Sequence, residues 1–484
     1  MFLRLGRAWE RIQGSLWFVP SVLVLLSVGL ALLMIWLDRH ISYQHVASLP
    51  VVLEAGPEGA RDMLSTIAGS VLAVAGVAFS FTIVVFSFAS SQYASRVLHN
   101  FMDDNTNQVV LGVLLGSFVY CLLVLRTVRL EDTSFVPVLS VSMALLLALA
   151  DLGLFILFIH HIAESIQAYH IIQRVGAATN HAVEMLFPPR PKPERPSYEA
   201  GASATPGSSS PDRQPPSVRP PAGIAPHVYD NMLAVDPATM REVHAVATGY
   251  IQMVDYDLLM KVASKHDLLV VLTKSPGNFA IKGETIAAVS PMQRATDEVC
   301  EQIRYSFVLG PHRTLFQDPQ YGVLLLSDIA IKALSPAIND PNTAIMSLNQ
   351  VGGVLRQVVQ RQSPTQLHCD ATGKVRIVAE VPSFESMMSQ AFDQVRRYGS
   401  GDASVVLKLL DVLAEIAEDA TDRSQIHILR EHMHAIVEDC DRRIATRRDR
   451  IMINNKLLTM LDALQLTREE VTLLRIHPDG AEAP

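Results

Sequence analysis

The chain has 484 residues, 49% of them hydrophobic and 18% charged, and its mean hydropathy is +0.25. The hydrophobic fraction and the mean hydropathy are high for a soluble protein of this length and indicate a membrane part with one or two soluble domains. A formal net charge of −8 without a dominant basic stripe argues against a nucleic-acid-binding protein. The four cysteines are scattered without metal-ligand spacing, so we interpret them as free thiols in a reducing compartment: Cys121, Cys300, Cys369 and Cys440.

Four apolar segments of the N-terminal part are candidates to cross a bilayer, which takes about 20 residues. We expect spans at 15–37, 64–89, 109–126 and 135–159, followed by a juxtamembrane helix that ends at 187. Arginines precede the first span and follow the fourth, although the loops on the opposite face carry arginines too. Their distribution favours an inner-membrane topology with both termini in the cytoplasm.

The second span carries small and hydroxyl side chains at helical spacing: Ser65, Gly69, Ala73, Gly76, Ser80, Ser87 and Ser91. Such a stripe either lets another helix approach closely or lines a polar path, and the sequence leaves both interpretations open. We expect this helix to continue into solvent over residues 90–105. In the third span, Gly112 and Gly116 form a further pair of small residues one turn apart.

Asp151 lies within the apolar fourth span. An ionisable residue in a membrane is costly and marks a cavity, a pairing or a pathway. One interpretation is a protonated or hydrogen-bonded carboxyl group that joins neighbouring helices. The other, which we state as a hypothesis, is that Asp151 faces the small-residue stripe and helps to set ion selectivity.

Composition changes abruptly at residues 188–226, which hold twelve of the 27 prolines and almost no large apolar residue. Such a segment cannot bury enough surface to fold, so we predict a disordered linker. A small α/β domain is expected at 227–290, with a helix capped by Asp255, and a mainly helical domain at 291–484. The last helix is expected at 466–475, with Thr467 and Glu470 as its capping box.

A second polar motif begins at Arg313 and ends where Ser335–Thr343 separates two apolar helices. Asp340 suits the N-cap of the second helix and Pro341 its first position. The alternative is that this helix N-terminus holds an anion, or that Asn339 and Asp340 hold a cation. Because buried charges need partners, we also expect a polar network, and the candidate residues of the motif are Arg313, Asp318, Asp328, Lys332, Asn339 and Asp340.

Two histidine groups have helical spacing, His160 with Glu164 and His427 with Glu431 and His434. They suit a metal or pH-sensing cluster, or are ordinary side chains on helix surfaces. The sequence contains no phosphate-binding glycine loop, nucleophile elbow or HExxH zinc motif. We therefore assign no catalytic residue, metal ligand or cofactor, and an enzyme is the third choice of function.

Several stretches together resemble a family of bacterial membrane proteins named domain of unknown function 2254. They are ARDMLSTIAGSVLAVAGVAFSFTIVVFSFASSQYASRVLHNFMDD, GYIQMVD, RTLFQD and ALSPAINDPNTA. The resemblance covers nearly the whole chain except the proline-rich segment. It implies a multi-pass protein of the bacterial inner membrane, and it brings no established activity or catalytic residues.

The fold class that follows is a four-span α-helical membrane domain joined to a cytoplasmic α+β domain with a mostly helical C-terminal part. The stripe and Asp151 favour a homo-oligomeric, channel-like or transport protein whose cytoplasmic domain regulates it. Four spans enclose little space, so a pore would need several copies. The alternative is a membrane-anchored sensor or scaffold whose cytoplasmic domain binds a small ligand or a protein partner. The expected partners are the lipid bilayer and further copies of the chain, and the sequence identifies no ion or ligand.

Overall fold

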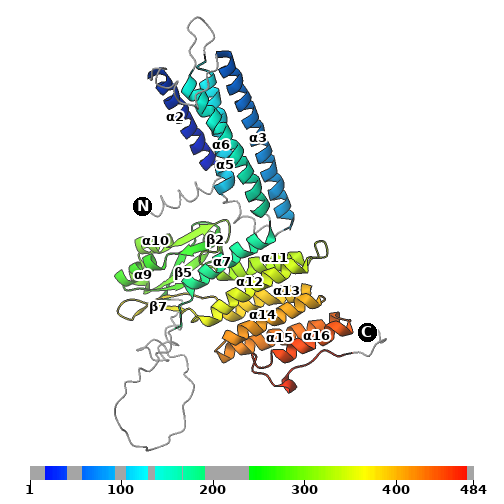
Figure 1. Ribbon diagram of the computed structural model, residues 1–484. Helices are drawn as coiled ribbons and strands as arrows, with labels where there is room; N and C mark the ends of the chain where they lie inside the picture. The colour runs from blue at the N-terminus through cyan, green and yellow to red at the C-terminus, as the bar shows by residue number, and fades with distance from the viewer. Residues whose placement is uncertain are drawn as a thin grey trace, which may run out of the picture. The chain divides into compact units, whose positions relative to one another are not determined.

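The computed structural model describes residues 17–40, 57–92, 105–128, 137–165, 167–190 and 239–476. The chain forms two compact units, Met1–Val175 with Leu325–Ser347 and Gly176–Leu324 with Leu348–Pro484 (Figure 1). The arginine-bearing N-terminus and most of the predicted linker and of the extension at 90–105 lie outside the described residues.

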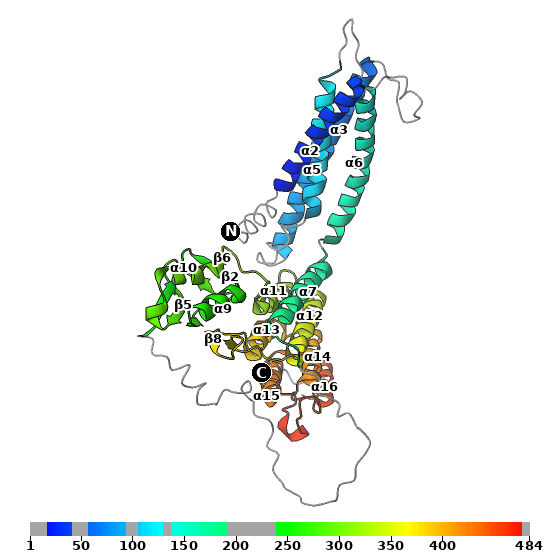
Figure 2. The same ribbon diagram turned by 90° about the vertical axis from the view of Figure 1, so that its left-hand side faces the viewer.

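Four apolar helices make up most of the first unit, as the sequence predicts. Each contains a stretch that is long and apolar enough to cross a membrane. They run side by side, and α5 contacts the other three (Figure 2). Their bounds are α2 Phe18–His40, α3 Pro57–Gln92, α5 Asn105–Leu125 and α6 Val138–Ser165.

The glycine pair of α5 brings this helix close to α2. A Cβ atom added to Gly112 would lie 2.8 Å from Cα of Pro20, and one added to Gly116 would collide with the side chain of Ser27. Small residues at a helix interface let two backbones approach. The two glycines therefore serve helix packing within one chain.

The start of α6 is bound to the end of α2 by a carboxylate. Asp38 accepts hydrogen bonds from the backbone amides of Leu139 and Ser140, both at 2.9 Å. These amides belong to the first turn of α6, which has no partners for them within the helix. Below this cap, Tyr120 is fully buried and donates to the carbonyl oxygen of Ser140 at 3.0 Å.

Two sheets form the β part of the second unit. The strand order is β1-β5-β3-β8-β7 in the larger sheet and β4-β2-β6 in the smaller one. All pairs are antiparallel except β3 with β8, where Val270 lies opposite Ile377. The strands are β1 Arg241–His244, β2 Gly249–Val254, β3 Leu269–Leu272, β4 Phe279–Ala280, β5 Thr285–Ser290, β6 Phe307–Gly310, β7 Leu367–Cys369 and β8 Val375–Val378.

Two short helices complete this β part, α9 Tyr256–Lys265 and α10 Asp297–Tyr305. Asp255 caps α9 as predicted, since its side chain accepts a hydrogen bond from the amide of Leu258. A single core joins the helices to the strands through buried side chains such as Ile251, Leu259, Ile286, Ile303 and Ile377. The sheet thus takes β7 and β8 from a part of the chain well beyond the α/β segment expected at 227–290.

The remaining helices are α7 Ala168–Leu186, α11 Pro319–Ala333, α12 Pro341–Gln360 and four C-terminal helices, and the C-terminal four pack on one another. The first three contribute residues to both units. Within the second unit, Arg361 donates to the carbonyl oxygen of Phe187 at 2.9 Å and holds the end of α7. The C-terminal helices are α13 Phe384–Gly399, α14 Ala403–Asp419, α15 Arg423–Arg443 and α16 Arg447–Thr459.

The helix predicted at 466–475 is wrong. The structure has a single 3-10 turn at Arg468–Glu470, opened by the predicted capping box, and then irregular chain. The reason is the side chain of Asn454 in α16, which binds both backbone groups of Leu474, at 2.9 Å to its oxygen and 2.8 Å to its nitrogen. These backbone groups therefore make no helical bonds.

Candidate functional site

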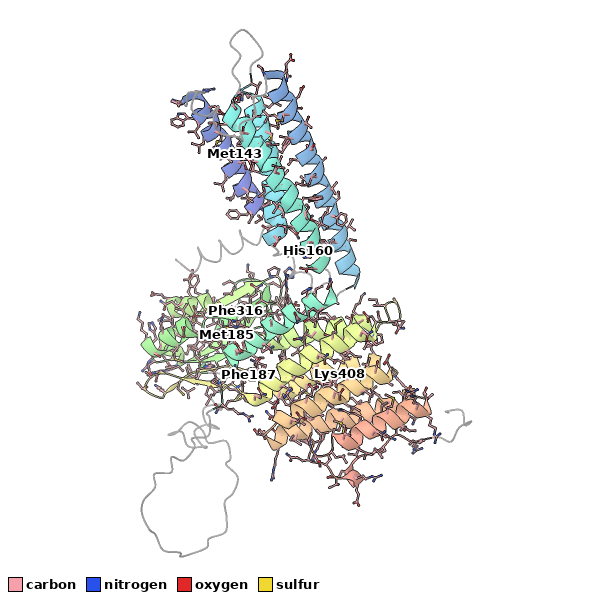
Figure 3. The ribbon with its side chains drawn as sticks, viewed as in Figure 1. Met143, His160, Met185, Phe187, Phe316 and Lys408 are labelled. Atoms are coloured by element: carbon pink, nitrogen blue, oxygen red, sulfur yellow. The ribbon has the colours of Figure 1, made fainter. Side chains whose placement is uncertain are left out.

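Asp151 is the buried acid of the apolar helices. Its side chain projects from α6, is 3% exposed, and accepts a hydrogen bond at 3.1 Å from Ser117 of α5. Its second oxygen, Oδ2, has no hydrogen-bond partner among the described residues. Figure 3 shows α6 with Met143 near one end and His160 near the other, so Asp151 belongs to the middle of this helix.

A cavity of about 220 Å³ lies beside Asp151. Its walls come from α3, α5 and α6, and its polar side chains are those of Thr66, Ser70 and Asp151. The other lining residues are apolar: Ile67, Val71, Val74, Leu114, Ala148, Leu152 and Phe155. Two hydroxyl-bearing residues and one acid thus line an otherwise apolar space, while Oδ2 of Asp151 itself has almost no accessible surface. A lining of this kind suits a cation or ordered water.

The small-residue stripe of α3 lies on a different face from this cavity. Among its described side chains, Ser65, Gly69, Ala73, Gly76, Ser80 and Ser87 are all exposed, and nothing lies within 4 Å of a Cβ added at Gly69 or Gly76. The buried face of α3 consists of Ala60, Leu64, Ala68, Val71, Ala75 and Ala78. The structure therefore brings Asp151 to α3, but to Thr66 and Ser70 rather than to the stripe.

Thr66 and Ser70 are the residues of this site that sequence reasoning missed. They are four apart in an apolar helix, so they share a face and flank Ile67 and Val71. The spacing of Thr66 and Ser70 is visible in the sequence. It did not stand out because these two residues and the residues of the stripe repeat with the same helical period.

The part of the polar motif that lies in the second unit, Arg313 and Asp318, forms a buried ion pair. Arg313 contacts one oxygen of Asp318 through Nε at 2.9 Å and Nη2 at 2.6 Å, and the amide of Tyr321 donates to the other oxygen at 3.0 Å. The Arg313 guanidinium also lies 4.8 Å from the centre of the Tyr321 ring. Burial raises the pKa of Asp318, and these contacts oppose the rise.

Gly277 closes this pair from the turn between β3 and β4. Its φ is +90°, a conformation that residues with a side chain rarely adopt, and an added Cβ would lie 2.8 Å from Cγ of Asp318. The turn that contains Gly277 is thus held against a charged pair that is distant in sequence.

Two further residues of the polar motif, Asn339 and Asp340, lie where helix α12 begins, and Asp340 caps it. Asp340 accepts from the amide of Thr343 at 3.1 Å and from its hydroxyl group at 2.6 Å, as expected of an N-cap. Asn339 has a positive φ of 49°, which places it in the left-handed region between the two helices. Asp328 and Lys332 are one turn apart on α11. The described contacts of Asp340 are those of a cap, and they leave open whether this motif binds an ion.

A larger cavity of about 700 Å³ lies wholly within the second unit, and sequence reasoning did not find it. Its walls come from the end of α7, the turn after β3, the start of α11, β7 and the segment between β8 and α13. Asp318 forms part of its wall, as do the stacked rings of Tyr256 and His368, whose centres are 5.0 Å apart. Burial raises the pKa of Tyr256 to about 12 and lowers the pKa of His368.

The histidine groups lie on exposed surfaces. His160 is 3.3 Å from Glu164 and His427 is 3.4 Å from Glu431, and all four side chains are more than half exposed. Within the described ranges, no group of three or more His, Cys, Asp or Glu residues has the geometry to hold a metal ion. Each cysteine is a free thiol there.

Comparisons with known proteins match nearly the whole chain to a family without a known activity. A family profile described as "Predicted membrane protein (DUF2254)" matches residues 13–415. The chain is 28% identical over 453 residues to the uncharacterized proteins Rv1290c of Mycobacterium tuberculosis and Mb1321c of Mycobacterium bovis, which covers 92% of this chain and 80% of each relative. No solved structure matches the chain.

Proposed function

The chain belongs to the DUF2254 family of predicted membrane proteins, and we propose that it is a homo-oligomeric transport protein for a cation. Its path would cross the bacterial inner membrane beside Asp151, and the second unit would be a cytoplasmic regulatory domain. The observation that supports this proposal best is Asp151 itself, a buried acid that lines a cavity among the apolar helices and whose Oδ2 has no described hydrogen-bond partner.

The physical argument rests on the cost of an unpaired buried carboxylate. An ionisable residue among apolar membrane helices is retained where it faces a partner, a cavity or a pathway. Ser117 satisfies only one oxygen of Asp151, and the hydroxyl groups of Thr66 and Ser70 line the same space. A cation, a proton or water is the partner that this arrangement lacks. A site that binds a cation in the middle of an apolar helix is suited to transport.

The cavity within one chain is small and has walls on three helices, so a continuous pore would need more than one copy. The exposed stripe of α3 supports this step, because small residues let helices of neighbouring copies approach closely. Light scattering of the purified protein in detergent tests it. We expect an oligomer, and a monomer would argue against a path that copies share.

Transport is tested with the full chain in liposomes and planar bilayers. We expect a cation current whose reversal potential shifts in Asp151→Asn, whereas Asp151→Glu keeps a carboxylate and retains the wild-type permeability ratio. Glu58→Gln is the matched control, since it removes an exposed acid from the first turn of α3. An unchanged permeability ratio in Asp151→Asn, or no current above that of protein-free bilayers, would contradict the proposal.

Location and orientation form a separate part of the proposal. We infer an inner-membrane protein with both termini in the cytoplasm, from the arginines that flank the first and fourth spans. Fusions of alkaline phosphatase and of green fluorescent protein to the C-terminus test the orientation, because the first is active only outside the cytoplasm and the second fluoresces inside it. Phosphatase activity at the C-terminus would reverse the assignment.

A second candidate function is a membrane-anchored sensor, and the large cavity of the second unit favours it. At about 700 Å³ its volume lies in the range of small-molecule sites. The two functions are compatible, since a ligand bound there would serve as the signal of a regulated transporter. They separate if liposomes show no current while the second unit still binds a ligand.

A further inference from the structure

We propose that the large cavity of the second unit is a binding site for a small organic amine in its protonated form. The site lies within Gly176–Leu324 and Leu348–Pro484, so it depends on neither the membrane helices nor the transported ion. The proposal therefore stands or falls independently of transport.

The aromatic wall of the cavity contains polar groups that can hydrogen-bond to a ligand. The rings of Tyr256 and His368 stack with an interplanar angle of 26°, and neither side chain has a hydrogen-bond partner among the described residues. Burial keeps the His368 imidazole uncharged at neutral pH, so that one ring nitrogen can accept a hydrogen bond. A ligand with an N–H group and an apolar body matches this wall, and a cation is attracted to the face of a tyrosine ring.

The charge of the cavity favours a cation. None of the described residues that line it is a lysine or an arginine, whereas Glu380 is one of the lining residues and is exposed. The other acid of the wall, Asp318, is already neutralised by Arg313. The uncompensated charge is therefore negative. A phosphate or carboxylate ligand would be repelled, and a protonated amine would be attracted.

Most other polar side chains of the wall are occupied, which narrows the choice of contacts. The amide of Gln317 binds both backbone groups of Val254, at 2.9 and 3.1 Å. Ser275 donates to the backbone oxygen of Glu380 at 2.9 Å, which fixes the segment that carries this carboxylate. Gln320 donates to the hydroxyl group of Ser386. Tyr256, His368, Gln366 and Glu380 are left as the side chains that would recognise the ligand, and Glu380 is the charged one among them.

Prolines stiffen the wall. Because the ring of proline fixes φ, a wall rich in proline loses little conformational freedom when a ligand binds. The prolines that line the cavity are Pro188, Pro276, Pro319, Pro364 and Pro382. They come from five separate segments of the second unit, so the cavity is formed before a ligand arrives.

Three probes with one ring and different charge test the proposal on the full chain in detergent: benzylamine, benzyl alcohol and benzoate. Binding is measured by isothermal titration calorimetry and by ligand-detected NMR, with empty micelles as the blank. An exposed carboxylate changes affinity modestly, so we expect benzylamine to bind about threefold to fivefold more tightly than benzyl alcohol. Benzoate should bind most weakly. Equal binding of the three probes, or no saturable binding of benzylamine, would overturn the proposal.

Variants assign the preference to the cavity. Glu380→Gln should remove the advantage of benzylamine over benzyl alcohol, and Glu380→Lys should make benzoate the better ligand. Glu418→Gln, which removes an exposed acid on α14 away from the lining residues, should change nothing. Tyr256→Phe keeps the ring and loses the hydroxyl group, so a weaker but still charge-selective site is expected. If Glu380→Gln and Glu418→Gln retain the same selectivity as the wild type, the amine does not bind here.

Discussion

Asp151 in the apolar helices and Asp318 in the second unit are buried to the same degree, 3% and 4% exposed, yet their oxygens have different partners. Both oxygens of Asp318 are bound, one by Arg313 and one by the backbone of Tyr321. Asp151 accepts a hydrogen bond from Ser117 on one oxygen, its other oxygen has no described partner, and the residue lines a cavity. The two carboxyl groups are thus equally buried, but only Asp318 has described partners for both of its oxygens.

The comparison teaches which buried carboxylate has a structural role. A charge whose hydrogen-bonding capacity is met within the fold holds its partners in place, and removing a partner leaves the charge exposed to an apolar surrounding. A carboxylate in which one oxygen lacks a hydrogen-bond partner is stabilised less by its surroundings, and that oxygen can bind a ligand. Substitutions at Asp318 and its neighbours should therefore change stability, and substitutions at Asp151 should change function.

The largest effect is expected when Arg313 is removed. Arg313→Ala leaves Asp318 without its counter-ion, and the free energy of unfolding should fall by about 3–5 kcal/mol. Thermal unfolding followed by circular dichroism measures the loss. Because the lone carboxylate would take up a proton more readily, the loss should be smaller at pH 5 than at pH 8. Arg442→Ala breaks an exposed pair with Glu438 and should have little effect. Equal effects of the two substitutions would contradict the structural role.

Two glycines with the same backbone conformation distinguish the cost of backbone strain from the cost of a side-chain collision with Asp318. Gly277 and Gly283 have φ values of +90° and +88°, but only Gly277 adjoins Asp318. Alanine at Gly283 should cost about 1–3 kcal/mol of the free energy of unfolding from backbone strain. Alanine at Gly277 should cost more, because its Cβ also pushes on the ion pair. The comparison of the two melting curves isolates this contact, and equal losses would show that the pair yields without cost.

Local signals in the sequence predicted much of this fold. The four apolar helices, the N-caps Asp255 and Asp340 and the capping box of Thr467 with Glu470 are confirmed. Each depends on residues within a few positions of one another, or on a long apolar run. Pairings between distant segments carry no such signal. The parallel pair of β3 with β8 joins Val270 to Ile377, and neither strand indicates the other.

The bounds of helix α16 are hard to predict from the sequence because this helix buries polar residues. Arg450 is 3% exposed and Asn454 is 6% exposed, so the hydrophobic period that marks a helix is weak. Arg450 is satisfied by the carbonyl oxygens of Ile444 and Arg475, at 2.6 and 2.8 Å. Such contacts become visible only once the chain is folded.

The site around Asp151 was predicted in part for a related reason. Asp151 itself stands out as a charge in an apolar run, and its position followed from the sequence. The face of α3 that meets it did not, because lipid tails are as apolar as leucine and residues facing lipid and residues facing protein look alike. The large cavity is lined by six separate segments and could not be predicted from any one of them.

At Asp151 the expected change in stability is small. Asp151→Asn keeps an oxygen that can accept a hydrogen bond from Ser117. Its free energy of unfolding should therefore lie within about 1 kcal/mol of the wild-type value. Ser117→Ala removes the single described bond and should cost about 1 kcal/mol, the usual value for one hydrogen bond. Both are measured in detergent by differential scanning calorimetry. A loss at Asp151→Asn as large as that at Arg313→Ala would make Asp151 a structural residue and break the comparison.

The smallest effect concerns a carboxylate that has partners but is open to solvent. Asp267 accepts from Lys374 and Arg376, at 2.5 and 2.6 Å, and these contacts hold its pKa well below the usual range. Its folded pKa is lower than its unfolded value of about 4, so its stabilisation is complete above pH 4 and is lost as the pH falls towards the folded pKa. Asp267→Asn should therefore lower the free energy of unfolding at pH 7, where the wild type has the full stabilisation, and the difference from the wild type should shrink as the pH falls below about 4.

Acid titration of the circular dichroism signal measures this dependence. Asp462→Asn, which replaces an exposed aspartate without a described ion pair, is the control and should titrate like the wild type. If Asp267→Asn also titrates like the wild type, partners alone do not make a carboxylate structural. A structural carboxylate would then need both partners and burial, as Asp318 has. Asp151 would differ from Asp318 only in the oxygen that lacks a described hydrogen-bond partner.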